Sequence, residues 1–324
     1  MLDHVNTYST FDNVAEAMFE VEEQSVHGRW GLEAEDKKML IKQPYNQYLS
    51  IVNKKYAVIQ NKDILDPLHE QMVEVFGEES FDGSEDSCKI NVSLARNGAV
   101  TFVEYKFPRI KESIETTNGF KTDLMFRAIM KNTFDASSAA ILYIGNIDAF
   151  CTNGMILGNF DIMRKTHRGK FEIKNFTKEF RNILDNYQAS TKVYADMAQT
   201  RVYNSNNVRN LFDKLVHKSK VDDPEWIANR NEDHASDLSN KLYAQYEVES
   251  EKRGNNIYSI MSAMTNFSSH GDGGNFPLNR QQNNNDNDSV RMFSRENKVS
   301  KWLTNPVWIQ FCDKHGLDIR SQAA

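Results

Sequence analysis

Cysteine is scarce in this chain, and long apolar runs are missing. Its 324 residues include three cysteines, Cys88, Cys151 and Cys312, which lie far apart and form no CxxC pair. A disulfide framework and a thiolate zinc site are therefore not expected. No run of about 18 apolar residues occurs, so the sequence predicts no membrane-spanning helix. Residues 1–10 lack the basic start and apolar stretch of a signal peptide, and we expect a cytoplasmic protein without a membrane partner.

The motifs of common catalytic sites are also absent. The chain contains no GxxxxGK(S/T) phosphate loop, no GxGxxG turn, no HExxH pair and no GxSxG elbow. Nucleotide hydrolysis by a P-loop, zinc proteolysis and serine hydrolase chemistry are therefore not expected. The acidic loop around Asp82 and Asp86 lacks the spacing of a calcium site. The apolar neighbours of Cys151 favour a buried thiol over a nucleophile. We predict no catalytic residue, no cofactor and no metal ion.

Net positive charge is lacking as well, but the charges are unevenly distributed. The chain carries a formal charge of -6 at pH 7. Residues 1–36 hold nine acidic side chains and one basic one, so the rest of the chain has a small positive excess. Seven basic and three acidic residues lie within 161–181, and four basic residues and one acidic residue within 291–301. This segregation permits a basic surface that contacts a polyanion, with an ordinary solvated surface as the alternative.

Hydrophobic periodicity predicts an α+β protein. A short acidic helix is predicted over residues 10–26, and two strands over 45–60. Apolar residues recur at helical spacing over 61–76, in a stripe that stops at Gly77. Asn97-Gly98 predicts a β-hairpin over 88–110, and two further strands are predicted over 139–144 and 149–160. These segments predict a mixed, largely antiparallel sheet with packed helices.

The second half is predicted to be mainly helical. Helical spacing covers residues 176–197, 208–216, 224–246 and 255–267. Residues 271–289 are rich in asparagine and too polar to order themselves alone. The predicted regions are an acidic N-terminal segment with a short helix (1–44), an α+β core (45–175), a helical region (176–270), an Asn-rich flexible loop (271–289) and a C-terminal basic and aromatic segment (290–324).

Two segments combine cations with aromatic side chains, a pattern typical of proteins that bind single-stranded nucleic acid. Lysine and arginine contact phosphates, while aromatic rings stack on unpaired bases. The alternative is that the aromatic residues belong to the core and the cations are solvated. The predicted nucleic-acid-binding residues are Arg164, Lys165, Arg168, Lys170, Phe171, Lys174, Arg291, Phe293, Arg295 and Lys298.

Four short segments carry a family resemblance. They are YAVIQN at 56–61, DASSA at 135–139, CTNGM at 151–155 and TNFSSH at 265–270. In these segments the chain resembles a phage- and plasmid-borne family whose domain has no assigned function (DUF932-like). The resemblance covers residues 45–270. It implies a mobile-element protein in a bacterial cytoplasm, associated with DNA replication and recombination, and it implies no catalytic residue.

Two function hypotheses from different classes follow. The first is a non-enzymatic, phage-type protein of DNA metabolism that binds single-stranded DNA and assists recombination, annealing or replication. The second is a structural or interaction protein of a phage, a homo-oligomer whose helical half forms subunit contacts, without nucleic-acid binding. An enzyme with an unrecognised site is a third alternative, which several titratable residues converging in one deep pocket would favour.

Overall fold

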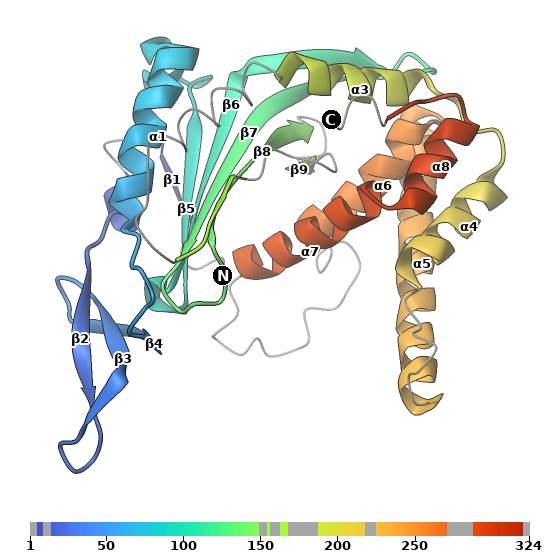
Figure 1. Cartoon of the computed structure of the whole chain (residues 1–324). Helices are drawn as coiled ribbons and strands as arrows, with labels where there is room; N and C mark the ends of the chain where they lie inside the picture. The colour runs from blue at the N-terminus through green and yellow to red at the C-terminus, as the bar shows by residue number, and fades with distance from the viewer. Residues whose placement is uncertain are drawn as a thin grey trace.

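Two antiparallel sheets form the N-terminal half of the chain and helices form the C-terminal half, so the predicted α+β fold is confirmed. The structure is a computed structural model, and it describes residues 5–8, 14–148, 154–155, 163–167, 187–217, 225–270 and 288–319. Figure 1 shows the large sheet arching above helix α7, with the small sheet projecting on one side and the helical half on the other.

The large sheet is an antiparallel meander extended by a strand at each edge. Its order is β1-β5-β6-β7-β8-β10, and β9 also pairs with β8. The predicted hairpin is confirmed, because β5 and β6 are joined at Asn97-Gly98, and the strand predicted over 139–144 is confirmed as β8. Most of 149–160 lies outside the described residues. The bounds are Val5–Tyr8 (β1), Lys89–Ala95 (β5), Val100–Glu115 (β6), Lys121–Thr133 (β7), Ala140–Asp148 (β8), Gly154–Met155 (β9) and Met163–Lys165 (β10).

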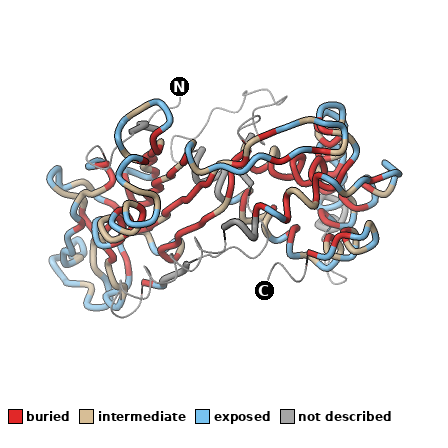
Figure 2. Tube along the Cα trace, turned by 90° about the horizontal axis from the view of Figure 1, so that it is seen from above, coloured by how far each residue is buried: buried red, intermediate tan, exposed pale blue. Residues whose placement is uncertain are grey.

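Buried side chains along the central strands alternate between the two faces of the large sheet, so both faces are buried. Val103 and Met130 belong to a cluster beneath helix α1 (Asn61–Phe76), whereas their neighbours Phe102 and Ile129 belong to a cluster on the opposite face. Successive side chains of a strand point to opposite faces, which explains the split. Figure 2 shows the buried residues running along these strands. Helix α1 has the predicted bounds and ends before a glycine with a φ of 77°.

The N-terminal segment forms a strand where a helix was predicted. Ala15–Ala17 is a single 3₁₀ turn and Val21–His27 is strand β2, so the helix predicted over 10–26 is wrong in its described part. Strand β2 pairs with β3 (Glu33–Lys42), and β3 pairs with β4 (Gln47–Asn53), in a three-stranded sheet. Pairing with β3 has overridden the local helical spacing. The second strand predicted within 45–60 is also wrong, because the partner of β4 is β3.

The described part of the C-terminal half contains six helices. The predicted helices over 208–216, 224–246 and 255–267 are confirmed, and the end of the one over 176–197 is confirmed. Their core includes Tyr194, Phe212 and Met261, together with Leu124 of the large sheet. Residues 271–287 of the predicted Asn-rich loop lie outside the described residues. The bounds are Tyr187–Gln199 (α3), Ser205–Val216 (α4), Glu225–Arg253 (α5), Ile257–His270 (α6), Asp288–Leu303 (α7) and Pro306–Lys314 (α8).

Gly98 supports a prediction about the turn between β5 and β6. It has a φ of +101°, and a Cβ at this position would lie 3.1 Å from Phe19 Cζ. Gly119, in the turn between β6 and β7, has a φ of +82° and nothing within 4 Å of its Cβ position. We expect Gly119→Ala to destabilise the fold by about 1 kcal/mol through the backbone, and Gly98→Ala by about 3 kcal/mol because Phe19 must also move. Urea unfolding measures both losses, and equal losses would contradict the prediction.

Candidate nucleic-acid interface

Strand β10 brings the start of the first basic segment (residues 161–181) to the edge of the large sheet. Its backbone register sets Arg164 opposite Ile141 and Lys165 opposite Ala140, both in β8. Ile141 belongs to the buried cluster on the face opposite α1, and Ala140 belongs to the cluster beneath α1. Directly opposed residues of an antiparallel pair occupy the same sheet face. The two predicted residues therefore hold register positions on either side of the sheet edge.

Helix α7 carries the second basic segment (residues 291–301). This helix also packs against strand β8. The Tyr143 hydroxyl of β8 donates to Asn297 Oδ1 of α7 at 3.3 Å. Arg127 Nη1 of β7 donates to Glu296 Oε1 of α7 at 2.7 Å. Tyr143 belongs to the cluster on the face opposite α1, so α7 lies against that face. The two predicted segments, far apart in sequence, thus both meet strand β8.

Arg127 is the buried charge that attaches α7 to the sheet. Its Nε lies 2.6 Å from Glu104 Oε1, and its side chain is 5% exposed. Asn91 Nδ2 donates to Glu104 Oε2 at 2.8 Å, and Lys106 Nζ lies 3.2 Å from the same oxygen. Burial raises the pKa of the Glu104 carboxyl, but Arg127 and Lys106 outweigh burial and lower that pKa to about 2. Glu104 is therefore ionised at neutral pH and balances the charge of Arg127.

Two of the predicted cations of α7, Arg295 and Lys298, contact side chains or backbone of the helical half. Arg295 Nε donates to the carbonyl oxygen of Ser268 in α6 at 3.0 Å. Lys298 Nζ lies 5.3 Å from the ring centroid of Trp302 and 5.7 Å from that of Phe267. A cation over an aromatic face is attracted by the electron density of the ring. These contacts order both cations beside the sheet.

The other predicted residues are placed only in part. Arg291 and Phe293 belong to α7, and their side chains lie outside the described part. The structure therefore brings β10 and α7 to the same strand, β8. The predicted residues outside the described part are Arg168, Lys170, Phe171 and Lys174.

The first resemblance segment, YAVIQN at 56–61, meets His167 at one end of the large sheet. The Tyr56 and His167 rings stack at 4.5 Å, and the Tyr56 hydroxyl donates to the carbonyl oxygen of Thr133 at 2.6 Å. The Ala57 amide donates to the His167 carbonyl oxygen at 2.9 Å. Burial lowers the pKa of His167, which favours its neutral form. Because His167 follows β10 by two residues, this stack anchors the first basic segment.

Two buried asparagines extend this arrangement. Asn61 Nδ2 donates to the carbonyl oxygen of Ala17 at 2.7 Å. Asn132 Nδ2 donates to the carbonyl oxygen of Ile59 at 2.8 Å and to Asn61 Oδ1 at 2.9 Å. Both asparagines are fully buried. A buried amide is costly to leave unpaired, so these bonds fix the start of α1 against β7.

Two turns at the same end of the sheet have unusual backbone conformations. Arg96 has a φ of 51° and Ala136 a φ of 57°. An ion pair of 2.6 Å between Arg96 Nη1 and Asp135 Oδ2 joins the turns. Side chains other than glycine seldom adopt a positive φ, and such residues cluster at functional sites when the surrounding structure fixes them. This end of the sheet is rigid and lies next to β10.

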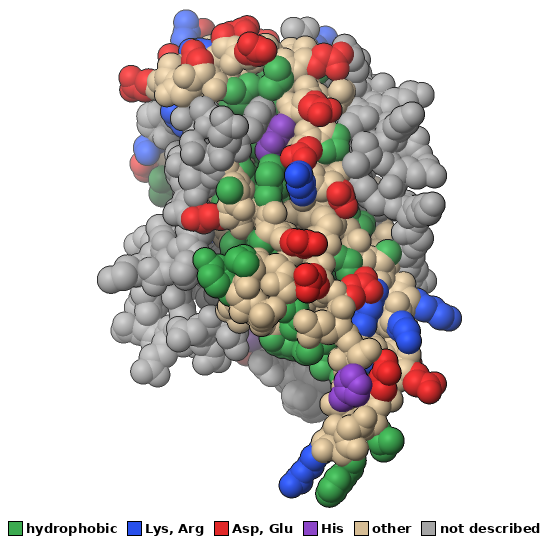
Figure 3. Space-filling model, turned by 90° about the vertical axis from the view of Figure 1, so that its left-hand side faces the viewer, with side chains coloured by type: hydrophobic (Ala, Val, Ile, Leu, Met, Phe, Trp, Pro, Cys, Tyr) green, Lys and Arg blue, Asp and Glu red, His purple; other side chains and the backbone are tan. Residues whose placement is uncertain are grey.

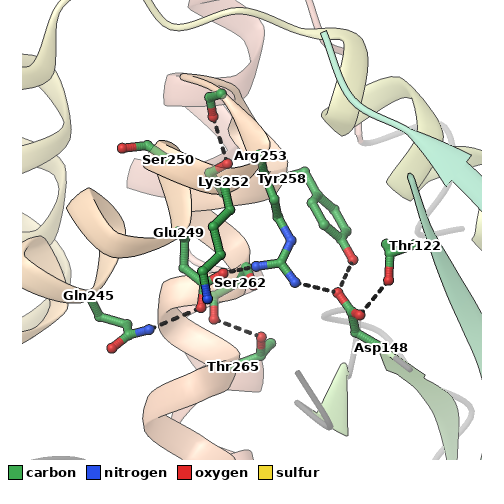
Figure 4. A network of polar contacts seen from close by, with 12 residues as sticks. Thr122, Asp148, Gln245, Glu249, Ser250, Lys252, Arg253, Tyr258, Ser262 and Thr265 are labelled. Atoms are coloured by element: carbon green, nitrogen blue, oxygen red, sulfur yellow. Dashed lines mark hydrogen bonds and ion pairs between the residues drawn. The ribbon is translucent and has the colours of Figure 1, made fainter. Parts of the chain in front are cut away.

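A second buried charge network lies at the opposite end of β8 (Figure 4). Asp148 accepts hydrogen bonds from Arg253 Nη2 at 3.0 Å, the Tyr258 hydroxyl at 2.7 Å and Thr122 Oγ1 at 2.6 Å. Arg253 also pairs with Glu249. The side chains of Asp148 and Arg253 are 0% and 1% exposed. We interpret the network as structural, because it connects the sheet to α5 and α6 inside the protein.

The described residues give no basis for metal or thiol chemistry. Within them, no group of three or more His, Cys, Asp or Glu side chains could hold a metal ion. Burial raises the pKa of the Cys88 and Cys312 thiols well above the usual range, which makes both poor nucleophiles. Cys151 lies outside the described residues. Among the described helices, none has the length and apolar character needed to cross a membrane.

A family of proteins matches most of the chain. The family described as Domain of unknown function (DUF932) matches residues 48–295. The chain belongs to the DUF932 family. No curated protein and no solved structure matches it. The DUF932 match begins in β4 and ends in α7, so it includes β10, the stacked Tyr56 and His167, and both basic segments as far as Arg295.

Sequence reasoning missed the residues that attach α7 to the rest of the DUF932 domain. Arg127 and Glu296 are 169 residues apart, and no spacing rule connects them. One signal pointed to Arg127, because it interrupts the apolar run LMFRAIM in a strand, where a charged residue needs a buried partner. His167 lies inside the first basic segment, but a neutral, stacked histidine has no signature in the sequence.

Proposed function

We propose that this DUF932 protein binds single-stranded DNA across a surface formed by β10 and α7, which both contact β8. The observation that carries the proposal is the convergence of two basic segments on that strand, through the β10 pairing and the Tyr143–Asn297 hydrogen bond. Lysine and arginine side chains on one surface bind phosphates and release counterions, whatever the base sequence. Phe171 and Phe293 are the proposed stacking residues for unpaired bases.

The distribution of acidic residues supports this choice of surface. Figure 3 shows the side of the molecule that carries α1, where acidic side chains are numerous. Such a side repels DNA, which favours a path along the sheet edge at β10, where Arg164 and Lys165 hold register positions on either face, toward α7. The exposed acids of α1 and of the following 3₁₀ turn (Glu78–Phe81) are Asp63, Glu70, Glu74, Glu78 and Glu79.

In this proposal the protein is a cytoplasmic, phage-type protein of DNA metabolism. Its part is to hold single strands during recombination, annealing or replication, and this task requires neither a catalytic residue nor a cofactor. This task is easier when α7 and β10 have fixed positions, because a preformed surface loses less conformational entropy when it binds DNA. The buried Arg127 pair and the Tyr56–His167 stack supply that rigidity.

Fluorescence anisotropy with a labelled thymidine oligonucleotide tests the proposal. We expect binding at about 50 mM salt, and an affinity about a hundredfold lower at about 200 mM, because several phosphate contacts release counterions. The paired substitution Arg164→Gln with Lys165→Gln should weaken binding by about tenfold. The control pair, Lys62→Gln with Lys192→Gln, removes the same charge from exposed positions on α1 and α3 and should bind like the wild type. Absence of binding at the lower salt concentration would refute the proposal.

The tip of the small sheet favours a second candidate function, that of an interaction protein. Trp30 is 84% exposed and Leu32 is 74% exposed, in the turn between β2 and β3. Figure 1 shows this hairpin projecting from the rest of the chain. Exposed apolar side chains that lie together mark protein contacts. Sedimentation without nucleic acid separates the candidates: an oligomer that Trp30→Ser dissociates, without DNA affinity, supports the second, and a DNA-binding monomer supports the first.

A further inference from the structure

A polar hollow of about 420 Å³ lies where the β6–β7 hairpin reaches the helical half. None of the residues that line it is acidic, and one is an arginine. Pockets of this size accept small organic molecules, and their polar groups decide which ones. The lining therefore suits an anion better than a cation or an apolar ligand. The lining residues are Thr117, Gln199, Thr200, Arg201, Tyr203 and His315.

The walls of the hollow are held in place by contacts between distant segments. Asn118 Nδ2, at the hairpin tip, donates to the carbonyl oxygen of Lys252 in α5 at 2.9 Å. Gln199 Nε2 donates to the carbonyl oxygen of Glu115 at 2.5 Å. Gly254 follows α5 with a φ of +79°, and a Cβ there would lie 3.3 Å from Thr117 Oγ1. The hollow is thus formed before any ligand arrives.

Arg201 projects from an extended link between α3 and α4. The Val202 amide donates to the carbonyl oxygen of Asn255 at 2.9 Å, and the Ile257 amide donates to that of Thr200 at 3.0 Å. Val202 is 3% exposed, so the side chains before and after it point outward. Among the described residues, none forms an ion pair with the exposed Arg201 guanidinium. An arginine without a carboxylate partner is suited to bind a phosphate through two parallel hydrogen bonds.

His315 and Tyr203 complete the recognition groups. His315 Nδ1 donates to the carbonyl oxygen of Phe311 at 2.8 Å, which leaves Nε2 of the neutral ring as an acceptor for an N–H or O–H group of a ligand. Tyr203 is 88% exposed and precedes Asn204, whose side chain accepts from the Asn206 amide and caps α4. The first turn of α4 contains no acidic residue, so its helix dipole also favours an anion. A ring held beside an arginine can stack on a base while the arginine binds the phosphate.

We infer that this hollow binds a nucleotide unit, with its phosphate on Arg201 and its base on Tyr203. The nucleotide is either free or part of a DNA strand, since both present a phosphate next to a planar base. The site uses residues other than those of β10 and α7. It therefore stands or falls independently of the proposed DNA-binding surface.

Titration calorimetry with thymidine monophosphate, with a short 5′-phosphorylated thymidine oligonucleotide and with inorganic phosphate tests the inference. We expect Arg201→Gln to weaken nucleotide binding by about tenfold or more, through the loss of a charge-assisted bond. Tyr203→Ala should weaken it by about tenfold, and Tyr203→Phe, which keeps the ring, should restore it. The matched controls are Lys192→Gln and Tyr45→Ala, which change exposed residues elsewhere. Because every substituted side chain is exposed, the midpoint of thermal unfolding should not change.

The comparison of ligands identifies the source of the nucleotide. Binding of the monophosphate and the oligonucleotide supports a general nucleotide site, and binding of the oligonucleotide alone supports a site for a DNA strand. Wild-type affinity in Arg201→Gln, or no binding of either nucleotide ligand, overturns the inference. Equal affinity for inorganic phosphate and thymidine monophosphate overturns the role given to Tyr203. If the Arg164→Gln with Lys165→Gln pair abolishes DNA binding but not monophosphate binding, the two sites are separate, as inferred.

Discussion

Replacing Arg127 with methionine should lower the free energy of unfolding by about 4 kcal/mol at neutral pH. The side chains of Arg127 and Glu296 are 5% and 2% exposed, and that of Glu104 is 15% exposed. Methionine fills a similar volume but takes the Arg127 charge away from Glu296, which is buried, and leaves Glu104 with Lys106 as its remaining cation. Urea unfolding followed by circular dichroism measures the loss.

A surface pair provides the control for this substitution. Lys111 Nζ lies 2.7 Å from Asp123 Oδ2, but the two side chains are 51% and 31% exposed. Lys111→Met should leave the free energy of unfolding almost unchanged, because water screens exposed pairs. If Arg127→Met is no more destabilising than Lys111→Met, then the pairing of α7 with the sheet contributes little to stability.

The stability of the Arg127→Met variant should rise less with pH than that of the wild type. In the wild type, the folded-state pKa of Glu104 is about 2, below the 4.5 of an unperturbed glutamate. Its stabilising contribution is therefore present above pH 4.5 and lost as the pH falls through 2. Without Arg127, Lys106 and the Asn91 hydrogen bond alone oppose the effect of burial, so the folded-state pKa of Glu104 is higher than in the wild type and its ionised form stabilises the fold less. The stability deficit of the variant should be smaller at acidic pH than at neutral pH, and a constant deficit would contradict this explanation.

Replacing Arg253 with methionine should also lower the free energy of unfolding by about 4 kcal/mol, and by more than Asp148→Asn does. Arg253 lies between two carboxylates, those of Asp148 and Glu249, at the junction of β8 with α5 and α6. Its removal takes away the cation that the two buried carboxylates share. Asp148→Asn instead leaves the Arg253–Glu249 pair intact, and its amide oxygen can still accept from Tyr258 or Thr122, so we expect a loss of about 2 kcal/mol.

The order of the two losses tests this interpretation of the network in Figure 4. Urea unfolding of Arg253→Met, Asp148→Asn and the wild type at one pH gives both losses. Lys121→Met is the control, because its ion pair with Glu115 is exposed at 72% and 53%. A larger loss for Asp148→Asn than for Arg253→Met would show that the hydrogen bonds of Asp148, rather than the charge of Arg253, hold the helices to the sheet.

Local sequence patterns were sufficient to predict the helices and strands that have clear boundary signals. Helix α1 matches its prediction because an apolar stripe over 61–76 ends at Gly77, and the β5–β6 hairpin matches because Asn97 and Gly98 both adopt a positive φ. The helix predicted over 10–26 was wrong, since pairing with a strand further along the chain decides the conformation of β2. Helical spacing within one segment contains no information about that partner.

The candidate site was also predicted only in part from the sequence. Composition identified the basic segments, and the structure adds that β10 and α7 both meet β8. The residues that hold this arrangement together, Arg127 with Glu296 and Tyr56 with His167, depend on contacts between distant segments. Arg201 and Tyr203 were not predicted either, because a pair of residues in a link between helices has no compositional signal. Their pocket exists only where the hairpin tip reaches the helical half.

The dependence of DNA affinity on salt tests most directly whether the two basic segments form one binding surface. The slope of log K against log salt would be compared for four proteins: the wild type, Arg164→Gln with Lys165→Gln, Arg291→Gln with Lys298→Gln, and all four substitutions together. Each pair should reduce the magnitude of the slope by about 1.4, and all four by about 2.8, because each lost phosphate contact accounts for about 0.7 with single strands. A wild-type slope in either pair, with unchanged affinity, would contradict the proposed surface.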